Sequence, residues 1–181
     1  MTTIVGIQLA DRAVIYADNQ VSSGNRKYNH KAMAKITKRG DWFIAGAGEV
    51  APLDIAHHIW NPPSPNAKDI KNLYHFVIAK VMPSLRECMK DNGYDFNAAT
   101  EDEYRFRLLI ATQGEIFEID DDLSVCLRND GLYGIGSGHE FALGALHAGA
   151  TPIEALEISA KLDLFTGKPF IKRESKKPIS T

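Results

Sequence analysis

Short β-branched runs at the start of the chain are typical of β-strands. Two of them cover residues 3–9 and 13–17, and the three-residue gap between them predicts a hairpin. A polar stretch, 19–31, follows. Residues 34–37 and 42–45 then predict a second hairpin around a turn at 38–41. We therefore expect four strands before the first helix.

Helical spacing replaces this pattern in the next part of the chain. Apolar residues recur every three or four positions from 70 to 89 and form one broad stripe, and Pro83 lies off that stripe and predicts a kink. A shorter helix is expected from about residue 48 to 60, ended by the proline-rich segment 61–65.

The second half of the chain repeats the order of strands and then helices. Strands are expected at 107–112, 115–119, 124–127 and 132–135. The capping-box patterns Ser137–Glu140 and Thr151–Glu154 predict helices that run to about residues 148 and 164, and a last strand is expected at 169–174. Paired helices between blocks of antiparallel strands indicate an α+β fold, a four-layer αββα sandwich of two stacked antiparallel sheets with helices on both outer faces.

Composition and charge narrow the class of protein. The 181 residues are 44% hydrophobic, enough for one domain with a real core, and 21 basic against 23 acidic residues leave no basic excess for nucleic acid. The apolar runs are too short to cross a membrane and no export signal is visible, so we expect no membrane contact. Two unclustered cysteines, Cys88 and Cys126, favour a reducing, cytoplasmic location.

Common catalytic signatures are missing from the sequence. It contains no HExxH, CxxC or Walker motif, and the glycines at 134–138 lack dinucleotide-binding spacing. The six histidines are scattered, and His57 and His58 diverge on a helix, so we assign the histidines to packing or surface roles rather than to a metal.

Thr2 is the unusual feature, because a hydroxyl residue here leads directly into a strand. If Met1 is removed, Thr2 presents a hydroxyl and a free α-amine with an ordinary pKa near about 8. The amine can then act as general base without any histidine. Many chains begin with Met-Thr, so an ordinary N-terminus is the alternative.

The segment TTIVGIQLADRAVIYADNQVSSG resembles the start of the bacterial HslV peptidase and of catalytic proteasome β-subunits, including an aspartate sixteen residues after the threonine. Four further motifs follow in family order as far as about residue 170: Ala34–Ile36, Ala45–Gly48, Ile135–Gly138 and Asp163–Gly167. The resemblance implies the N-terminal nucleophile hydrolase fold and a single proteasome-type peptidase domain over residues 1–181.

The resemblance also implies a catalytic centre. Thr2 would be the nucleophile, Lys35 the cation that lowers the pKa of the neighbouring groups, and Asp18 the partner that orients that lysine. A single-residue insertion leaves Lys31 as the alternative lysine. The N–H of Gly48 would be the oxyanion donor.

Further site residues follow from the same resemblance. Ser137, Asp163 and Thr166 would form an accessory cluster, in which Ser137 also caps a helix. Backbone carbonyls of Ala160, Asp163 and Thr166 match a monovalent or divalent cation site of some relatives; no cofactor is required for the reaction.

Gly46 is the alternative oxyanion donor. The positions matching the primary specificity pocket are Val21, Thr37, Gly46 and Val50.

The implied function is a self-compartmentalising threonine peptidase. It would cleave unfolded polypeptides inside a homo-oligomeric ring or stacked double ring fed by an ATP-dependent unfoldase. Retention of Met1 would bury the amine in a peptide bond, so a catalytically silent ring or shell protein is the alternative. An amidohydrolase acting on a small amide is a third interpretation. The acidic stretch 95–104 and the tail after 170 depart from the family, which leaves their ring contacts open.

Overall fold

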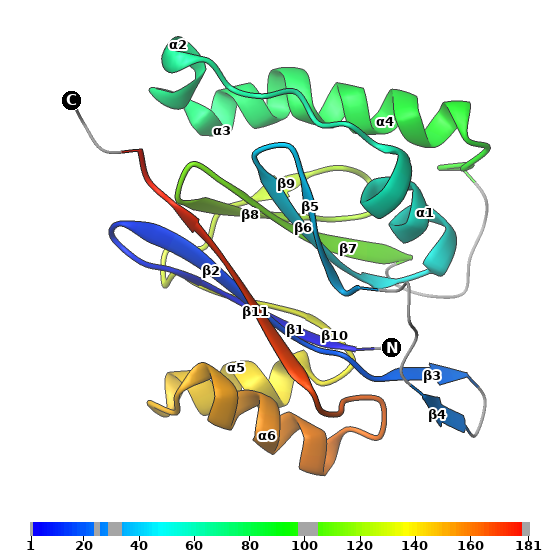
Figure 1. Cartoon of the computed structure of the whole chain (residues 1–181), viewed down its shortest axis with the longest axis vertical. Coiled ribbons are helices and arrows are strands. Elements are labelled where there is room, and N and C mark those ends of the chain that lie inside the picture. The colour runs from blue at the N-terminus through cyan, green and yellow to red at the C-terminus, as the bar shows by residue number, and fades with distance from the viewer. Residues whose placement is uncertain (1, 24–25, 29–33, 98–104, 179–181) are drawn as a thin grey trace.

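The computed structural model describes residues 2–23, 26–28, 34–97 and 105–178. It forms four layers, with helices outside two stacked antiparallel sheets (Figure 1). The α+β sandwich expected from the sequence is confirmed. The alternative lysine, Lys31, and most of the acidic stretch lie outside the described residues.

The first sheet pairs the start of the chain with its end. Its strands lie in the order β10 (Leu132–Gly136), β1 (Thr3–Gln8), β2 (Arg12–Asp18) and β11 (Phe170–Lys176). Thr3 lies opposite Gly136, and Phe170 lies opposite Asp18. This register brings the first residues of β1 beside the end of β10 and the end of β2.

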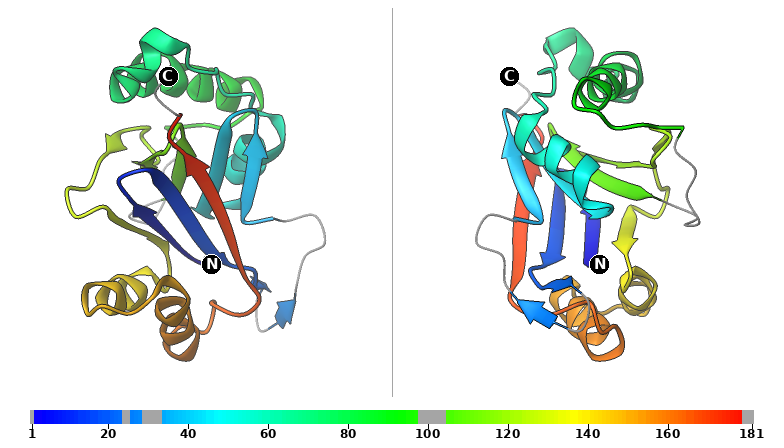
Figure 2. Two further views of the ribbon diagram at one scale, coloured as in Figure 1. Left: turned by 60° about the vertical axis from the view of Figure 1, so that its left-hand side comes forward. Right: turned by 90° about the vertical axis from the view of Figure 1, so that its right-hand side faces the viewer.

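The second sheet contains the remaining long strands. Its order is β5 (Ile36–Arg39), β6 (Trp42–Gly48), β7 (Phe106–Thr112), β8 (Glu115–Ile119) and β9 (Val125–Cys126). Gly48 lies opposite Phe106. Figure 2 shows this sheet packed over the first.

The polar stretch holds two strands that the sequence analysis did not expect. β3 (Val21–Ser23) and β4 (Arg26–Tyr28) pair with each other as a separate two-stranded ribbon. Their sequence lacks the alternation of apolar and polar residues that identifies a half-buried strand. In the described part of the chain, six strands therefore precede the first helix, not four.

Helices cover both outer faces. On the second sheet lie α1 (Val50–Asp54), the π-helix η1 (Ile55–Ile59), α2 (Ala67–Ile70), α3 (Leu73–Phe76), the π-helix η2 (Val77–Val81) and α4 (Met82–Asp91). On the first sheet lie α5 (His139–His147) and α6 (Pro152–Leu162). Among the described residues, none of the helices is both long and apolar enough to span a bilayer.

The long helix expected from 70 to 89 is divided. The π-helical stretch η2 comes directly before α4, whose second residue is Pro83. Proline cannot donate a hydrogen bond to the carbonyl four residues back, and it crowds that carbonyl. The irregularity expected at Pro83 is therefore accommodated as a wider turn before α4.

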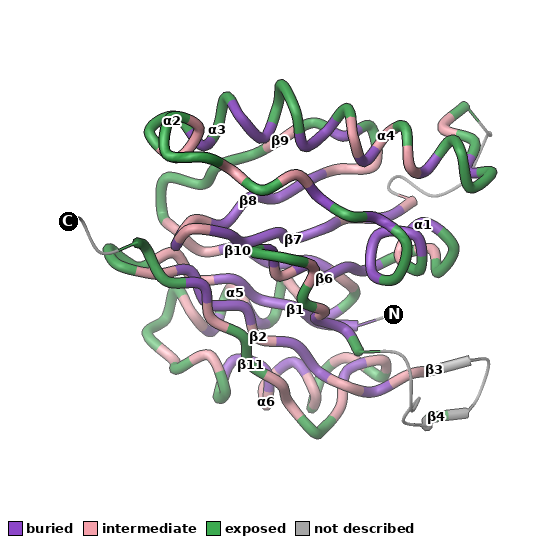
Figure 3. Tube along the Cα trace, turned by 45° about the horizontal axis from the view of Figure 1, so that its top comes forward, coloured by how far each residue is buried: buried purple, intermediate pink, exposed green. Residues whose placement is uncertain are grey.

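Among the described residues, three apolar cores join the four layers. One lies under α1–α4 and includes Trp42, Leu85 and Phe117, one lies between the sheets and includes Ile4 and Leu109, and the third lies under α5 and α6. Figure 3 shows the buried residues along the strands and the exposed ones on the outer turns of the helices. The packed sheets fix the strand ends from which the polar cluster described next is built.

Candidate active site

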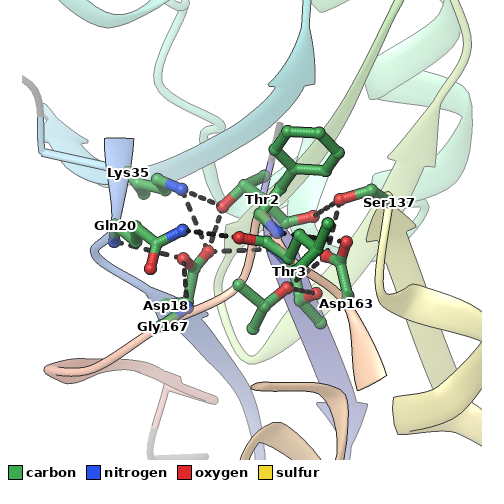
Figure 4. Close-up of polar contacts among 11 residues, drawn as sticks. Thr2, Thr3, Asp18, Gln20, Lys35, Ser137, Asp163 and Gly167 are labelled. Atoms are coloured by element: carbon green, nitrogen blue, oxygen red, sulfur yellow. Dashed lines mark hydrogen bonds and ion pairs between the residues drawn. The ribbon is translucent and has the colours of Figure 1, made fainter. Parts of the chain in front are cut away.

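Thr2 lies immediately before β1 with only 3% of its surface exposed. Its Oγ1 donates a hydrogen bond to Asp18 Oδ1 and accepts one from Lys35 Nζ (Figure 4). Gly136 ends the neighbouring strand with φ +91°, and a Cβ at this glycine would collide with the Thr2 carbonyl. The backbone of β10 can therefore lie directly against Thr2.

Asp18 ends β2 and is fully buried. Its Oδ1 accepts hydrogen bonds from Thr3 N at 2.9 Å and Lys35 Nζ at 3.0 Å. Its Oδ2 accepts from Gln20 N and Gly167 N, both at 3.1 Å. With so many donors, both oxygens of the buried carboxylate are satisfied, which is the condition for keeping a charge inside a protein.

Lys35 lies just before β5 and is 9% exposed. Burial lowers the pKa of its ammonium group, and the negative charges of Asp18 and Asp163 oppose that shift. Because its pKa is lowered, Lys35 can exchange a proton with the neighbouring Thr2 hydroxyl more readily than a solvated lysine could. The structure thus brings Thr2, Asp18 and Lys35 together, in the arrangement that the resemblance implies.

A second polar cluster flanks Thr2 on the side away from Lys35 (Figure 4). Asp163 follows α6, and its Oδ2 accepts hydrogen bonds from Ser137 Oγ at 2.7 Å and Thr166 Oγ1 at 2.5 Å. Ser137 Oγ also lies 3.4 Å from the Thr2 carbonyl oxygen. The three residues predicted as an accessory cluster are therefore connected through Asp163, and Ser137 is the one that contacts Thr2.

One prediction about Ser137 is wrong. The N-cap of α5 is Gly138, and no side chain caps that helix. The Ser137 hydroxyl donates to Asp163 Oδ2 and accepts no hydrogen bond from an N–H group of the helix. The capping box at Thr151 and Glu154, by contrast, is present and starts α6.

The predicted oxyanion donor, Gly48, ends β6 with φ +116°. A Cβ there would collide with the backbone of Arg105 and Phe106, so only glycine fits this position. For Gly46 a Cβ would point at the side chains of Leu53 and Leu108. The role of either glycine as oxyanion donor stays a prediction.

Three of the four predicted pocket residues lie in the second sheet or its first helix, and the fourth, Val21, lies in the separate ribbon. Val21 begins β3, Gly46 lies in β6, and Val50 is the half-exposed first residue of α1. Thr37 lies in β5. Its Oγ1 is hydrogen-bonded to Nδ1 of His57 at 2.7 Å. Burial lowers the pKa of His57 to about 4, so it is a neutral hydrogen-bonding partner at neutral pH.

The predicted cation site also stays a prediction. Of its carbonyls, that of Asp163 accepts a hydrogen bond from the Thr166 N–H at 3.3 Å. Within the described part of the chain, no group of three or more histidine, cysteine or acidic side chains is arranged to hold a metal ion.

Sequence reasoning missed Thr3, Gln20 and Gly167. Gln20 connects β2 to the loop after α6, because its Nε2 donates to the Leu164 carbonyl at 3.0 Å and its own N–H binds Asp18. Gly167 contributes a backbone N–H, which no side-chain pattern reports. Thr3 reads as an ordinary β-branched strand residue.

Comparison with known proteins identifies the fold. No protein-family model matches the chain, and no curated protein matches it in sequence. Among solved structures, BPH of Thiobacillus denitrificans matches with a TM-score of 0.69 at 21% identity, covering 98% of this chain and 100% of BPH. Eukaryotic HslV from Trypanosoma brucei matches with a TM-score of 0.64 at 20% identity, covering 96% and 99%.

A third match is an Anbu (Gly-1) mutant from Hyphomicrobium sp. strain MC1. Its TM-score is 0.64 at 15% identity, with 97% of this chain and 82% of that chain covered. The chain therefore has the same fold as HslV, BPH and Anbu, and the resemblance to HslV found in the sequence is confirmed at the level of the fold.

Proposed function

We propose that the chain is a threonine-type endopeptidase with Thr2 as its nucleophile after removal of Met1. The observation that carries this proposal is the environment of one atom: Thr2 Oγ1 is bonded to both Asp18 and Lys35 and lies directly at the start of β1. A threonine with a purely structural role would not need a buried lysine–aspartate pair on its hydroxyl.

In the proposed first step, the free α-amine of Thr2 takes the proton of Oγ1 as that oxygen attacks the carbonyl carbon of a peptide bond. The N–H of Gly48 would stabilise the resulting oxyanion. The tetrahedral intermediate then collapses, the C–N bond breaks, and the ammonium group returns its proton to the leaving amine. The product of this step is an ester between the substrate acyl group and Thr2.

In the second step, water attacks the ester and gives a proton to the same amine. The C–O bond to Oγ1 breaks, Oγ1 regains a proton, and a carboxylic acid leaves. Throughout both steps the Lys35 cation would stabilise negative charge that develops on Oγ1, and Asp18 would hold Lys35 in place.

The substrate and the assembly complete the proposal. Small or apolar residues at Val21, Thr37, Gly46 and Val50 favour apolar substrate side chains. By likeness of fold to HslV, we infer a homo-oligomeric ring or stacked double ring that admits unfolded polypeptide, with an ATP-dependent unfoldase as its partner. A cation at the carbonyls after α6 would be structural.

The test is a fluorogenic peptide assay on purified chain whose N-terminus is determined by mass in the same preparation. We expect a mass lower by one methionine and hydrolysis of peptides with an apolar residue before the scissile bond. Threonine at position 2 is small enough for ordinary methionine removal. A chain that keeps Met1 and hydrolyses nothing would instead support the silent shell protein.

A further inference from the structure

A continuous chain of hydrogen bonds runs from β1 through the accessory cluster. Thr3 is fully buried, and its Oγ1 lies 2.5 Å from Thr166 Oγ1. Thr166 Oγ1 bonds Asp163 Oδ2, which also accepts from Ser137 Oγ (Figure 4). Ser137 Oγ also lies 3.4 Å from the Thr2 carbonyl oxygen, so the cluster touches two adjacent residues of the chain, Thr2 and Thr3.

The direction of these bonds follows from counting protons. Each hydroxyl has one proton to donate, and Thr166 gives its proton to the carboxylate of Asp163. Thr3 must therefore donate to Thr166. Asp163 Oδ1 in turn accepts from Phe165 N at 3.2 Å, so every bond in the cluster points toward the carboxylate.

The cluster is tightly enclosed. A Cβ at Gly138 would collide with Thr3 Oγ1 and lie 2.9 Å from Thr166 Oγ1 and 3.0 Å from Asp163 Oδ2. The Gly138 carbonyl is itself held by Ser159 Oγ at 2.9 Å. The Thr3 hydroxyl therefore lies in a confined polar site. If this position served only apolar packing, valine would fill it equally well and no hydrogen-bond partner would be needed.

We propose that Thr3 is a positioning residue, whose hydroxyl holds Thr166 and, through it, the carboxylate of Asp163 in place beside Thr2. The inference rests on the proposed function and adds to it a residue next to the nucleophile that touches no reacting atom.

The positioning role of Thr3 can be measured through the pKa of the Thr2 amine, which depends on the charged groups around Thr2. In the described part of the chain they are Asp18 from β2, Lys35 from before β5 and Asp163 from after α6. On the β10–α5 side the neighbours are Ser137 and the titratable His139, whose Nδ1 lies 2.5 Å from the Gly136 carbonyl. Burial lowers the pKa of Lys35, and the charge of Asp163 is one of those that oppose this shift, so the electrostatic field of Asp163 reaches the lysine beside Thr2.

In the processed chain the α-amine of Thr2 lies in that same field, and a nearby carboxylate raises the pKa of an amine. The hydroxyls of Ser137 and Thr166 delocalise the negative charge of Asp163 by donating to it. The hydrogen bond from Thr3 to Thr166 polarises the Thr166 hydroxyl and so strengthens the bond from Thr166 to Asp163. Loss of the Thr3 donor should therefore leave more negative charge on Asp163 and raise the pKa of the amine. One neutral hydrogen bond limits this rise to about half a pH unit.

The experiment compares Thr3→Val, which keeps the shape and removes the hydroxyl, with Thr3→Ser, which keeps the hydroxyl. Thr112→Val is the matched control: Thr112 is also fully buried, and its hydroxyl bonds the Asp41 carbonyl at the other end of β7 from Phe106. For each chain we would measure the acetylation rate of the Thr2 amine against pH, by mass of the N-terminal peptide, and the pH profile of peptide hydrolysis.

In Thr3→Val we expect the amine pKa and the acidic limb of the profile to move up by about 0.5 pH unit. Hydrolysis would fall about threefold below that pKa and little above it, because the rate follows the fraction of free amine. Thr3→Ser and Thr112→Val should match the wild type. An unshifted Thr3→Val amine in a processed, active chain overturns this inference alone. A wild-type chain without a free Thr2 amine overturns the proposed function and this inference together.

Discussion

Thr2→Ala is expected to abolish peptide hydrolysis, with a loss of at least about a thousandfold, while the chain still folds and assembles. The substitution removes the oxygen that attacks the substrate in the proposed mechanism. Asp18 and Lys35 remain 3.0 Å apart and still neutralise each other, so neither becomes an unpaired buried charge. Hydrolysis rates and light scattering of the same preparations measure both effects.

Two further variants make the Thr2 result specific. Thr2→Ser keeps a hydroxyl and should retain part of the activity. Thr112→Ala also removes a fully buried threonine hydroxyl, but far from the cluster, and should leave hydrolysis unchanged. Hydrolysis at the wild-type rate by Thr2→Ala would move the nucleophile elsewhere, and Ser137 would be examined next.

Lys35 and Asp18 are expected to act as one unit. Lys35→Ala removes the cation beside Thr2 Oγ1, and Asp18→Asn removes the carboxylate bonded to that buried lysine, so that its pKa falls further. Each variant should lose about a hundredfold or more in kcat/KM, and the double variant should be only a few-fold worse than either. Two independent residues would show losses that multiply.

The structure suggests Asp18→Asn rather than Asp18→Ala for this cycle. Alanine would leave the N–H groups of Thr3, Gln20 and Gly167 all without an acceptor, at a cost of about 1–3 kcal/mol for each buried group, whereas asparagine keeps one acceptor oxygen for part of them. Lys38→Ala is the control, because Lys38 is an exposed lysine on β5 three residues from Lys35. If Lys35→Ala stays active, the proposed role of this lysine is wrong.

The order of strands and helices could be predicted because each sheet packs against an apolar core on both faces, so its strands appear in the sequence as short apolar runs. β8 was predicted with its observed ends, Glu115 and Ile119. The pattern failed where burial does not decide the structure. β3 and β4 form a ribbon apart from both sheets, and the π-helical turns of η1 and η2 keep nearly the same apolar spacing as an α-helix.

The candidate site was predictable only in part. The resemblance proposed Thr2, Asp18 and Lys35, and the fold brings them together from three separate segments. The loop that places Gly167 N–H on Asp18 could not be foreseen, because a backbone donor leaves no trace in the sequence. Ser137 was assigned a helix cap from its spacing to Glu140, whereas the nearby Asp163 carboxylate is its actual partner.

The claim that a free Thr2 amine performs the chemistry can be tested within a single sample. The chain would be produced with an N-terminal extension that a separate, specific protease removes directly before Thr2. Peptide hydrolysis would then be followed together with the fraction of chains that begin at Thr2. Activity that is absent before cleavage and rises in proportion to that fraction is the expected result. Full activity while the extension still covers Thr2 would contradict the account.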